Sequence, residues 1–221
     1  RERLIRLNGL PTCYERPVLP EGLGERSRFG FSDNAHIYLC PQSLFKIHPA
    51  FDRVLVSIVE SDPQAEIVFI EGAHKYWTEN LRVRFAATSD LLAAKTRFMP
   101  FLSGEDFIRL ISAADVMLDP IHFSGGNTSF EGFATGTPII TMAGKFMRSR
   151  VTYAMYRQMG IDACIANSPE DYARLAVETA SVRSLRDDLR SEILAAGERL
   201  YNQTGPVYEI ADVLEAERRS G

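Results

Sequence analysis

The sequence "DPIHFSGGNTSFEGFATGTP", residues 119–138, decides the fold of this chain. It begins at the end of one short apolar segment and ends where the apolar segment "PIITM" begins. Between them lie two glycines, which permit a tight turn and a close approach of the backbone, and then a run that suits a helix. The sequence therefore predicts a strand, a glycine-rich turn, a helix and a second strand. The helix is expected to begin at Asn127, Thr128 and Ser129.

The same alternation of strand and helix runs along most of the chain. Apolar segments predict strands at 36–40, 66–72, 96–101, 115–120, 138–142 and 162–166. Helical periodicity, capping residues and a closing glycine predict helices at 51–60, 76–94, 103–114, 150–160, 168–180, 181–201 and 206–218. Apolar strands that alternate with helices indicate a Rossmann-like parallel sheet with helices on both faces.

Composition narrows the class of protein. The 221 residues carry a formal net charge of −4 and no long basic run, which argues against a nucleic-acid or anionic-membrane surface. No apolar run approaches the roughly 20 residues that span a bilayer. Three well-separated cysteines argue against a disulfide framework or a metal cluster, so we expect a reducing, cytoplasmic environment and no metal ligands. They are Cys13, Cys40 and Cys164.

The chain divides by pattern into three parts. Residues 1–34 contain several prolines and glycines without a sustained period, so they are expected to form a linker or a tail. Residues 35–204 are expected to form the Rossmann-like domain, and residues 205–221 a C-terminal helix.

Ligands of parallel sheets bind in the loops at the carboxyl ends of the strands. In the loop after 115–120, Gly125 and Gly126 precede the start of a helix, where free backbone N–H groups attract anions. Glu131 follows about one turn into the helix, where it would accept hydrogen bonds from sugar hydroxyls. A second interpretation is a plain turn with Thr128 or Ser129 as the N-cap and Glu131 as a first-turn acid. The local pattern leaves both open.

Two further loops carry candidate side chains. After 36–40, Gln42 and Ser43 are polar, and Lys46 would neutralise a diphosphate or else be an exposed lysine whose stem covers apolar surface. After 96–101, the loop residues would meet the edge of a nucleobase or else pack in the core. These loop residues are Pro100, Phe101 and Leu102.

The loops together resemble a known family. The segments "CPQSLFKIHPAFD" (40–52), "RFMPFLSGEDFIRLISAADVMLDPIHFSGGNTSFEGFATGTPIITMAGKFMRSRVTYAMYRQMG" (97–160) and "SPEDYARLAVETA" (168–180) are similar to the C-terminal half of the O-linked N-acetylglucosamine transferase and SPINDLY family. The opening, "RERLIRLNGLPTCYERP", resembles the segment by which the family leaves its N-terminal catalytic half. This family is glycosyltransferase family 41, whose members have the GT-B fold.

The resemblance implies the donor half of an inverting, metal-independent enzyme that transfers a sugar from a UDP-sugar to an acceptor protein. It implies that Lys46 contacts the diphosphate and matters for catalysis, with Gln42 and Ser43 beside it. It further implies that the turn at 125–129 binds phosphate and that Glu131 holds the ribose. The residues implied at the uracil are Pro100, Phe101 and Leu102.

The sequence also departs from the family pattern. Many members carry His where this chain has Asn127, which leaves UDP-N-acetylglucosamine and UDP-glucose as alternative donors. The N-terminal catalytic half and the tetratricopeptide repeats that often precede it do not occur in these 221 residues, so both are expected partners of the domain. The competing hypothesis is a non-catalytic nucleotide-sugar-binding module that needs a separate acceptor-binding domain.

Overall fold

The computed structural model describes residues 4–220, so the outermost residues of the predicted 1–34 and 205–221 segments lie outside it. Six parallel strands form one sheet in the order β3-β2-β1-β4-β5-β6. The strands are β1 (His36–Cys40), β2 (Ala65–Ile70), β3 (Thr96–Met99), β4 (Val116–Leu118), β5 (Ile139–Met142) and β6 (Ile165–Ala166). The predicted Rossmann-like parallel sheet is confirmed.

The strand order reverses direction between β1 and β4, at the centre of the sheet. Pairing is long on one side of this point, where β1 and β2 share five residue pairs and β2 and β3 share four. On the other side β4 and β5, like β5 and β6, share two pairs each. β1 and β4 themselves share two, Tyr38 with Val116 and Leu39 with Met117. Such a switch point leaves a crevice beyond the carboxyl ends of the two central strands.

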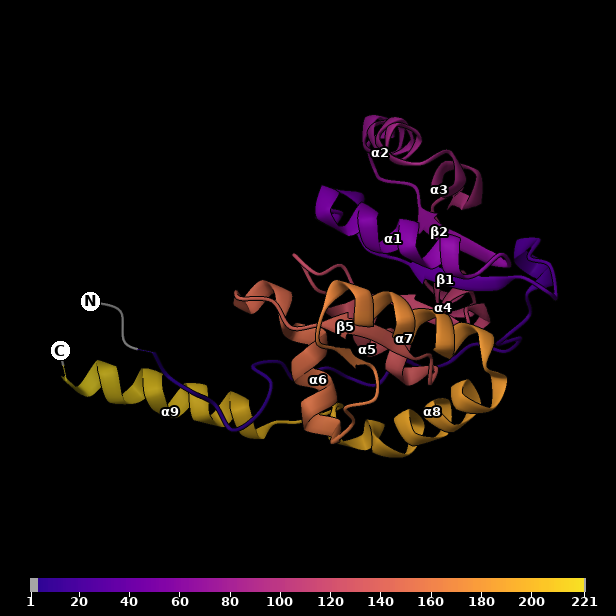
Figure 1. Cartoon of the computed structure of the whole chain (residues 1–221). Coiled ribbons are helices and arrows are strands. Elements are labelled where there is room, and N and C mark those ends of the chain that lie inside the picture. Colours follow the sequence, from indigo (N-terminus) through magenta and orange to yellow (C-terminus); the bar gives the residue numbers. More distant parts are fainter. Residues whose placement is uncertain (1–3, 221) are drawn as a thin grey trace.

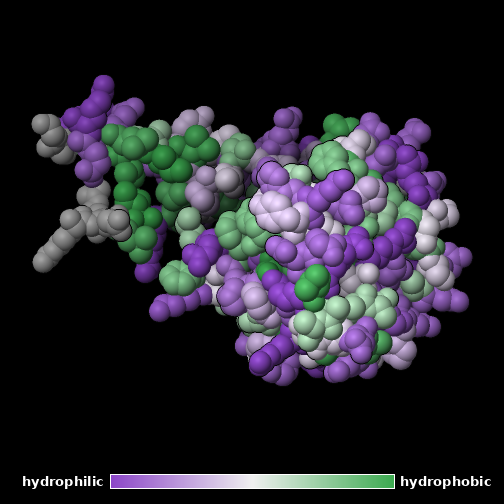
Figure 2. All heavy atoms as spheres, turned by 90° about the horizontal axis from the view of Figure 1, so that it is seen from above, coloured by the Kyte–Doolittle hydropathy of each residue, from purple (hydrophilic) through white to green (hydrophobic). Residues whose placement is uncertain are grey.

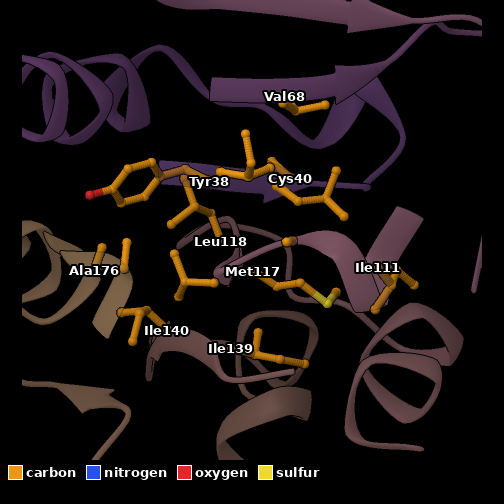
Figure 3. Close-up of a cluster of buried hydrophobic side chains, with 14 of the residues drawn as sticks. Tyr38, Cys40, Val68, Ile111, Met117, Leu118, Ile139, Ile140 and Ala176 are labelled. Carbon is orange, nitrogen blue, oxygen red and sulfur yellow. The ribbon is translucent and has the colours of Figure 1, made fainter. Parts of the chain in front are cut away.

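Helices cover both faces of the sheet. Figure 3 shows Ala176 of α7 (Pro169–Ser181) beside Tyr38, Leu118 and Ile140 on one face, and Ile111 of α4 (Gly104–Ala113) beside Met117 and Ile139 on the other. The remaining helices are α1 (Pro49–Ser61), α2 (Lys75–Thr88), α3 (Asp90–Lys95), α5 (Asn127–Ala134), α6 (Val151–Met159), α8 (Arg183–Ala196) and α9 (Gly205–Ser220). Short 3-10 turns lie at Ser27–Phe29, Leu44–Lys46, Met147–Ser149 and Gly197–Arg199.

The helix ends follow the predicted capping signals. The Ser103 and Ser168 side chains accept hydrogen bonds from the backbone N–H groups three residues later, and Gly160 ends α6 in the left-handed conformation. One prediction is wrong: the single helix at 76–94 is two helices, α2 and α3. They separate at Ser89, whose backbone is extended and whose hydroxyl caps α3 by accepting from the Leu92 N–H.

Some strands are shorter than predicted. The strand predicted at 96–101 ends at Met99, because Pro100 has no N–H to donate to a neighbouring strand. The strand predicted at 162–166 is reduced to Ile165–Ala166, since the residues before it form a turn.

Both ends of the described chain lie together on an arm that projects from the body. In Figure 1 the early residues run beside α9, and Asn8 bonds Glu209 of that helix through its backbone N–H at 3.0 Å. Figure 2 shows apolar side chains gathered on this arm, where Leu4, Tyr208 and Leu214 are exposed. Among residues 4–220, none of the helices combines the length and the apolar character that crossing a membrane requires.

Candidate functional site

The two loops that follow the central strands meet at the switch point. The loop after β1 contains the 3-10 turn Leu44–Lys46, and the loop after β4 ends where α5 begins. Lys46 joins them, because its Nζ donates to the Gln42 side chain at 2.9 Å and to the Ser124 carbonyl at 3.3 Å. The ammonium also lies 4.6 Å from the centre of the Phe123 ring, a cation–π distance.

Lys46 is not the freely exposed lysine of the second interpretation. Burial lowers the pKa of its ammonium, while the nearby Asp119 carboxylate acts in the opposite direction. A half-buried cation held against two loops has lost part of its hydration, so its attraction for an anion is stronger than that of a surface lysine.

Gln42 makes the second link between the loops. It is buried, its side-chain oxygen accepts from Lys46, and its Nε2 donates to the Thr128 hydroxyl. An amide can donate and accept at the same time, which is why this residue type fits between an ammonium and a hydroxyl. The residues predicted from separate stretches of sequence, Gln42, Lys46 and Thr128, therefore form one connected group.

Asp119 holds the glycine turn in place from beneath. Its buried carboxylate accepts from the Gly125 N–H at 2.6 Å, the Thr141 hydroxyl at 2.6 Å and the Ser124 hydroxyl at 2.8 Å. Burial raises the pKa of this carboxyl, and the hydrogen bonds oppose that rise. The Thr141 hydroxyl comes from β5, so Asp119 connects the glycine turn to the neighbouring strand.

The start of α5 leaves backbone donors free. Its N-cap is Gly126, which makes no side-chain cap, so the assignment of Thr128 or Ser129 as the N-cap is wrong. The N–H groups of Asn127 and Thr128 have no acceptor among the described residues. The Ser129 hydroxyl does not share this role, since it is buried and hydrogen-bonded to Thr152 at 2.8 Å. An uncapped helix start, connected to a lysine through Gln42, is an arrangement that attracts phosphate.

A cavity of about 310 Å³ opens beside this group. The predicted residues that line it are Gln42, Ser43, Phe101, Leu102 and Thr128. Gly72 and Trp77 also line it, and sequence reasoning missed both. The signal was available, because the segment after β2 ends at the same edge of the sheet as the other loops.

Seven predicted residues do not line this cavity: Lys46, Pro100, Gly125, Gly126, Asn127, Ser129 and Glu131. Pro100 is exposed and is not among its lining residues. Glu131 is half-buried on α5, and its carboxylate forms no hydrogen bond or ion pair within residues 4–220; burial raises the pKa of this carboxyl. Tyr14, whose pKa is raised by burial and by the Glu131 charge, stacks on the neighbouring Phe130 at 4.4 Å.

Comparison with known proteins places this geometry in context. The chain is 25% identical over 222 residues to the probable UDP-N-acetylglucosamine–peptide N-acetylglucosaminyltransferase SPINDLY of Arabidopsis thaliana, with 95% of the chain and 23% of that relative covered. It is 23% identical to the UDP-N-acetylglucosamine–peptide N-acetylglucosaminyltransferase of Caenorhabditis elegans, covering 79% of the chain and 15% of the relative. The chain thus spans less than a quarter of the length of these relatives.

Solved structures share the fold. A mutant of the Thermobaculum terrenum O-GlcNAc transferase matches with a TM-score of 0.79 and 22% identity, over 99% of this chain and 41% of that one. Anabaena HepE in complex with UDP and glucose matches with a TM-score of 0.60 and 14% identity, over 86% of this chain and 51% of that one. The predicted likeness to one half of a GT-B glycosyltransferase is confirmed.

The resemblance found in the sequence is confirmed as well. The family model described as glycosyl transferase family 41 matches residues 17–204, which is most of the chain. The chain therefore belongs to glycosyltransferase family 41.

Proposed function

We infer that this chain binds the donor of a UDP-sugar-dependent protein glycosyltransferase. The observation that carries the inference is the convergence of Lys46 and the uncapped start of α5 across the switch point. Together they supply an ammonium and backbone N–H groups where a diphosphate would cross from one loop to the other. The relatives, whose names give UDP-N-acetylglucosamine as a substrate, support the same donor class.

The reaction that fits is transfer with inversion at the anomeric carbon. An acceptor oxygen or nitrogen attacks that carbon, the bond to the diphosphate breaks, and UDP leaves with the bonding electrons. Negative charge grows on the diphosphate, and Lys46 with the α5 amides would stabilise it without a divalent cation. The acceptor side chain belongs to the acceptor protein, and the base that takes its proton is assigned to the rest of the full-length protein.

The nucleoside would occupy the cavity that Phe101, Leu102 and Trp77 line. Aromatic and aliphatic walls suit the flat face of a base. Glu131, with no hydrogen-bond partner of its own in the described chain, is proposed to accept from the ribose hydroxyls. Pro100 is retained as a proposed contact to the uracil through its carbonyl group.

Titration calorimetry with UDP tests the donor site directly. We expect one UDP to bind per chain, and EDTA to leave the affinity unchanged. Absence of binding at millimolar UDP would contradict the donor site. Turnover of UDP-N-acetylglucosamine and UDP-glucose by the full-length protein with an acceptor protein then identifies the sugar.

The second candidate function is a nucleotide-sugar-binding module that requires a separate acceptor-binding domain. In that case UDP binds to the 221-residue chain, but no sugar is transferred until the other domain is added.

Replacing Gly125 by alanine is expected to weaken UDP binding about tenfold, by disturbing one or two hydrogen bonds. The new methyl group would lie 2.7 Å from Gln42 Nε2 and too close to the Ser129 hydroxyl, so Gln42 and Thr128 must move. Gly104→Ala is the matched control, since nothing lies within 4 Å of its added methyl group. Equal affinities for the two variants, measured by calorimetry, would contradict the role of the turn.

The affinity for UDP is expected to fall as the pH rises, and the fall should begin below pH 10.5, the ordinary pKa of lysine. The pKa of Lys46 is lowered by burial, so the ammonium loses its charge earlier than a surface lysine and attracts the diphosphate less. The contribution of Lys46 to folding stability has the opposite sign. The folded chain binds fewer protons than the unfolded chain in this window, so that contribution rises with pH.

Calorimetry at several pH values measures the UDP affinity, and urea unfolding at the same pH values measures the stability. Together they test whether the two quantities change with pH in opposite directions. Lys46→Arg is the control, because a guanidinium keeps its charge throughout the range. A wild-type affinity that stays as flat with pH as that of the arginine variant would count against a lysine contact to the diphosphate.

A further inference from the structure

A second hollow lies at the opposite edge of the sheet, beside the amino ends of β1 and β4. Its volume is about 520 Å³, within the range of roughly 300–1,000 Å³ typical of small-molecule sites. Its lining is dominated by charge: Arg26, Arg183, Arg186 and Arg190 face it together with Asp115. Three of these arginines come from α8, where spacings of three and four residues place them on one helix face.

Asp115 is the anionic floor of this hollow. Its carboxylate is 2% exposed and accepts from Arg26 Nη2 at 2.5 Å and from the Ile37 N–H at 2.7 Å. It also forms an ion pair with Arg186 Nη1 at 3.2 Å. One carboxylate carries one negative charge, so it cannot neutralise both guanidinium groups. Positive charge therefore remains at the floor.

Arg190 adds a third guanidinium that Asp115 does not bind directly. Its Nη2 donates to the carbonyls of Ala114 at 3.2 Å and Ser112 at 3.3 Å. Its Nε is buried and finds no acceptor among the described residues. Burial lowers the pKa of this arginine, and the charge of Arg186 lowers it further. The cations thus repel one another where they meet.

The rim supplies partial compensation. Arg183 pairs with Asp187 at 3.5 Å, with both side chains largely exposed, and Asp33 also lines the hollow. The hollow is therefore lined by four arginines and three aspartates, and the excess of positive charge lies at its buried end rather than at its rim.

The arginines are already fixed in position. Arg26 donates to the Ala35 carbonyl at 3.0 Å, and Arg186 donates to the Ala180 carbonyl at 2.5 Å. These bonds hold the ends of nearby elements, which is a structural role. That role alone leaves the excess charge and the unpaired Nε of Arg190 unexplained. Side chains that are ordered beforehand lose little entropy when a ligand binds.

We propose that this hollow binds a phosphate-bearing small molecule, whose oxygens accept from Arg183, Arg186 and Arg190. Guanidinium groups match phosphate through paired N–H donors, and an anion between them removes their mutual repulsion. This site lies at the other edge of the sheet from the β1–β4 crevice and is independent of the proposed donor function.

Titration of inorganic pyrophosphate into the 221-residue chain tests the proposal, with UDP present in saturating amount and ionic strength held constant with chloride. We expect one pyrophosphate to bind per chain. Arg190→Gln is expected to weaken this binding about tenfold, the effect of one lost charge-assisted contact. Asp187→Asn is expected to strengthen it severalfold, because Arg183 loses its competing partner at the rim. Arg157→Gln, an exposed arginine on α6, should change nothing.

Several outcomes would overturn the proposal. They are no pyrophosphate binding with UDP present, equal binding by the Arg190 and Asp187 variants and the wild type, or binding that Lys46→Ala abolishes while Arg190→Gln retains it. The last result would place the anion in the crevice between β1 and β4. If Arg190→Gln does not fold, Asp187→Asn decides alone, since its side chain is 59% exposed and its removal leaves the core intact.

Discussion

Lys46→Ala is expected to lower sugar transfer by the full-length protein about 10²- to 10³-fold, the range for losing one group that stabilises developing charge. UDP affinity of the 221-residue chain should fall about tenfold, because the diphosphate loses a charge-assisted contact. Folding stability should change little. Burial lowers the pKa of the Lys46 ammonium, which means that burying the charge costs folding free energy. Replacing the lysine by alanine removes this cost.

The matched control is Lys95→Ala. Lys95 is a partly buried lysine that donates to the Pro63 carbonyl, away from the β1–β4 crevice. Steady-state kinetics, calorimetry and urea unfolding should separate the two variants. If Lys46→Ala lost stability and turnover in the same proportion, Lys46 would be a structural lysine and the donor site would need another cation.

Asp119→Ala is expected to destabilise the fold by about 3 kcal/mol, near the upper range for a single substitution. The change leaves two buried donors, the Gly125 N–H and the Thr141 hydroxyl, without an acceptor. The Ser124 hydroxyl loses one acceptor and keeps the Thr152 hydroxyl at 2.9 Å. Asp119→Asn should cost less, because the amide keeps one accepting oxygen and nearly the same volume. Urea unfolding measures both, and an unchanged slope shows that the midpoint reports stability.

Asp162→Ala is the control for this pair. Asp162 is a surface aspartate that pairs with Arg157 on α6, and exposed ion pairs contribute little to stability. If Asp119→Ala lowered stability no more than Asp162→Ala, the hydrogen bonds beneath the glycine turn would be unimportant for the fold. In that case a loss of UDP binding in Asp119→Ala would need a different explanation.

The sheet was predictable because each strand and helix carries its own local signal. Apolar runs marked all six strands, and serine caps marked α4 and α7. The division of 76–94 into two helices was missed, because Ser89 caps α3 from within a continuous helical pattern. A serine inside a helix and a serine between two helices look alike in sequence when no glycine or proline separates them.

The candidate site was predictable where function depends on position along the chain. Lys46 and Gln42 follow one central strand, Thr128 follows the other, and parallel topology brings them together. The orientation of side chains was not predictable. Ser129 points into the core toward Thr152, although it stands next to Thr128, because successive residues of a helix face different directions. Trp77, in the first turn of α2, was missed because the segment after β2 was not considered, although β2 ends at the same edge of the sheet as the other strands.

The crevice lies where the pairing between neighbouring strands changes from long to short. β1 and β2 pair through five residues, and β2 and β3 pair through four. The pairs β1–β4, β4–β5 and β5–β6 each involve only two residue pairs. Lys46 and Gln42, from the loop after β1, bond to Ser124 and Thr128, which follow β4 on the side of the sheet with the shorter pairing. A diphosphate held by the same groups would contact the loops after both central strands, so the bound substrate would itself stabilise the pairing of β1 with β4.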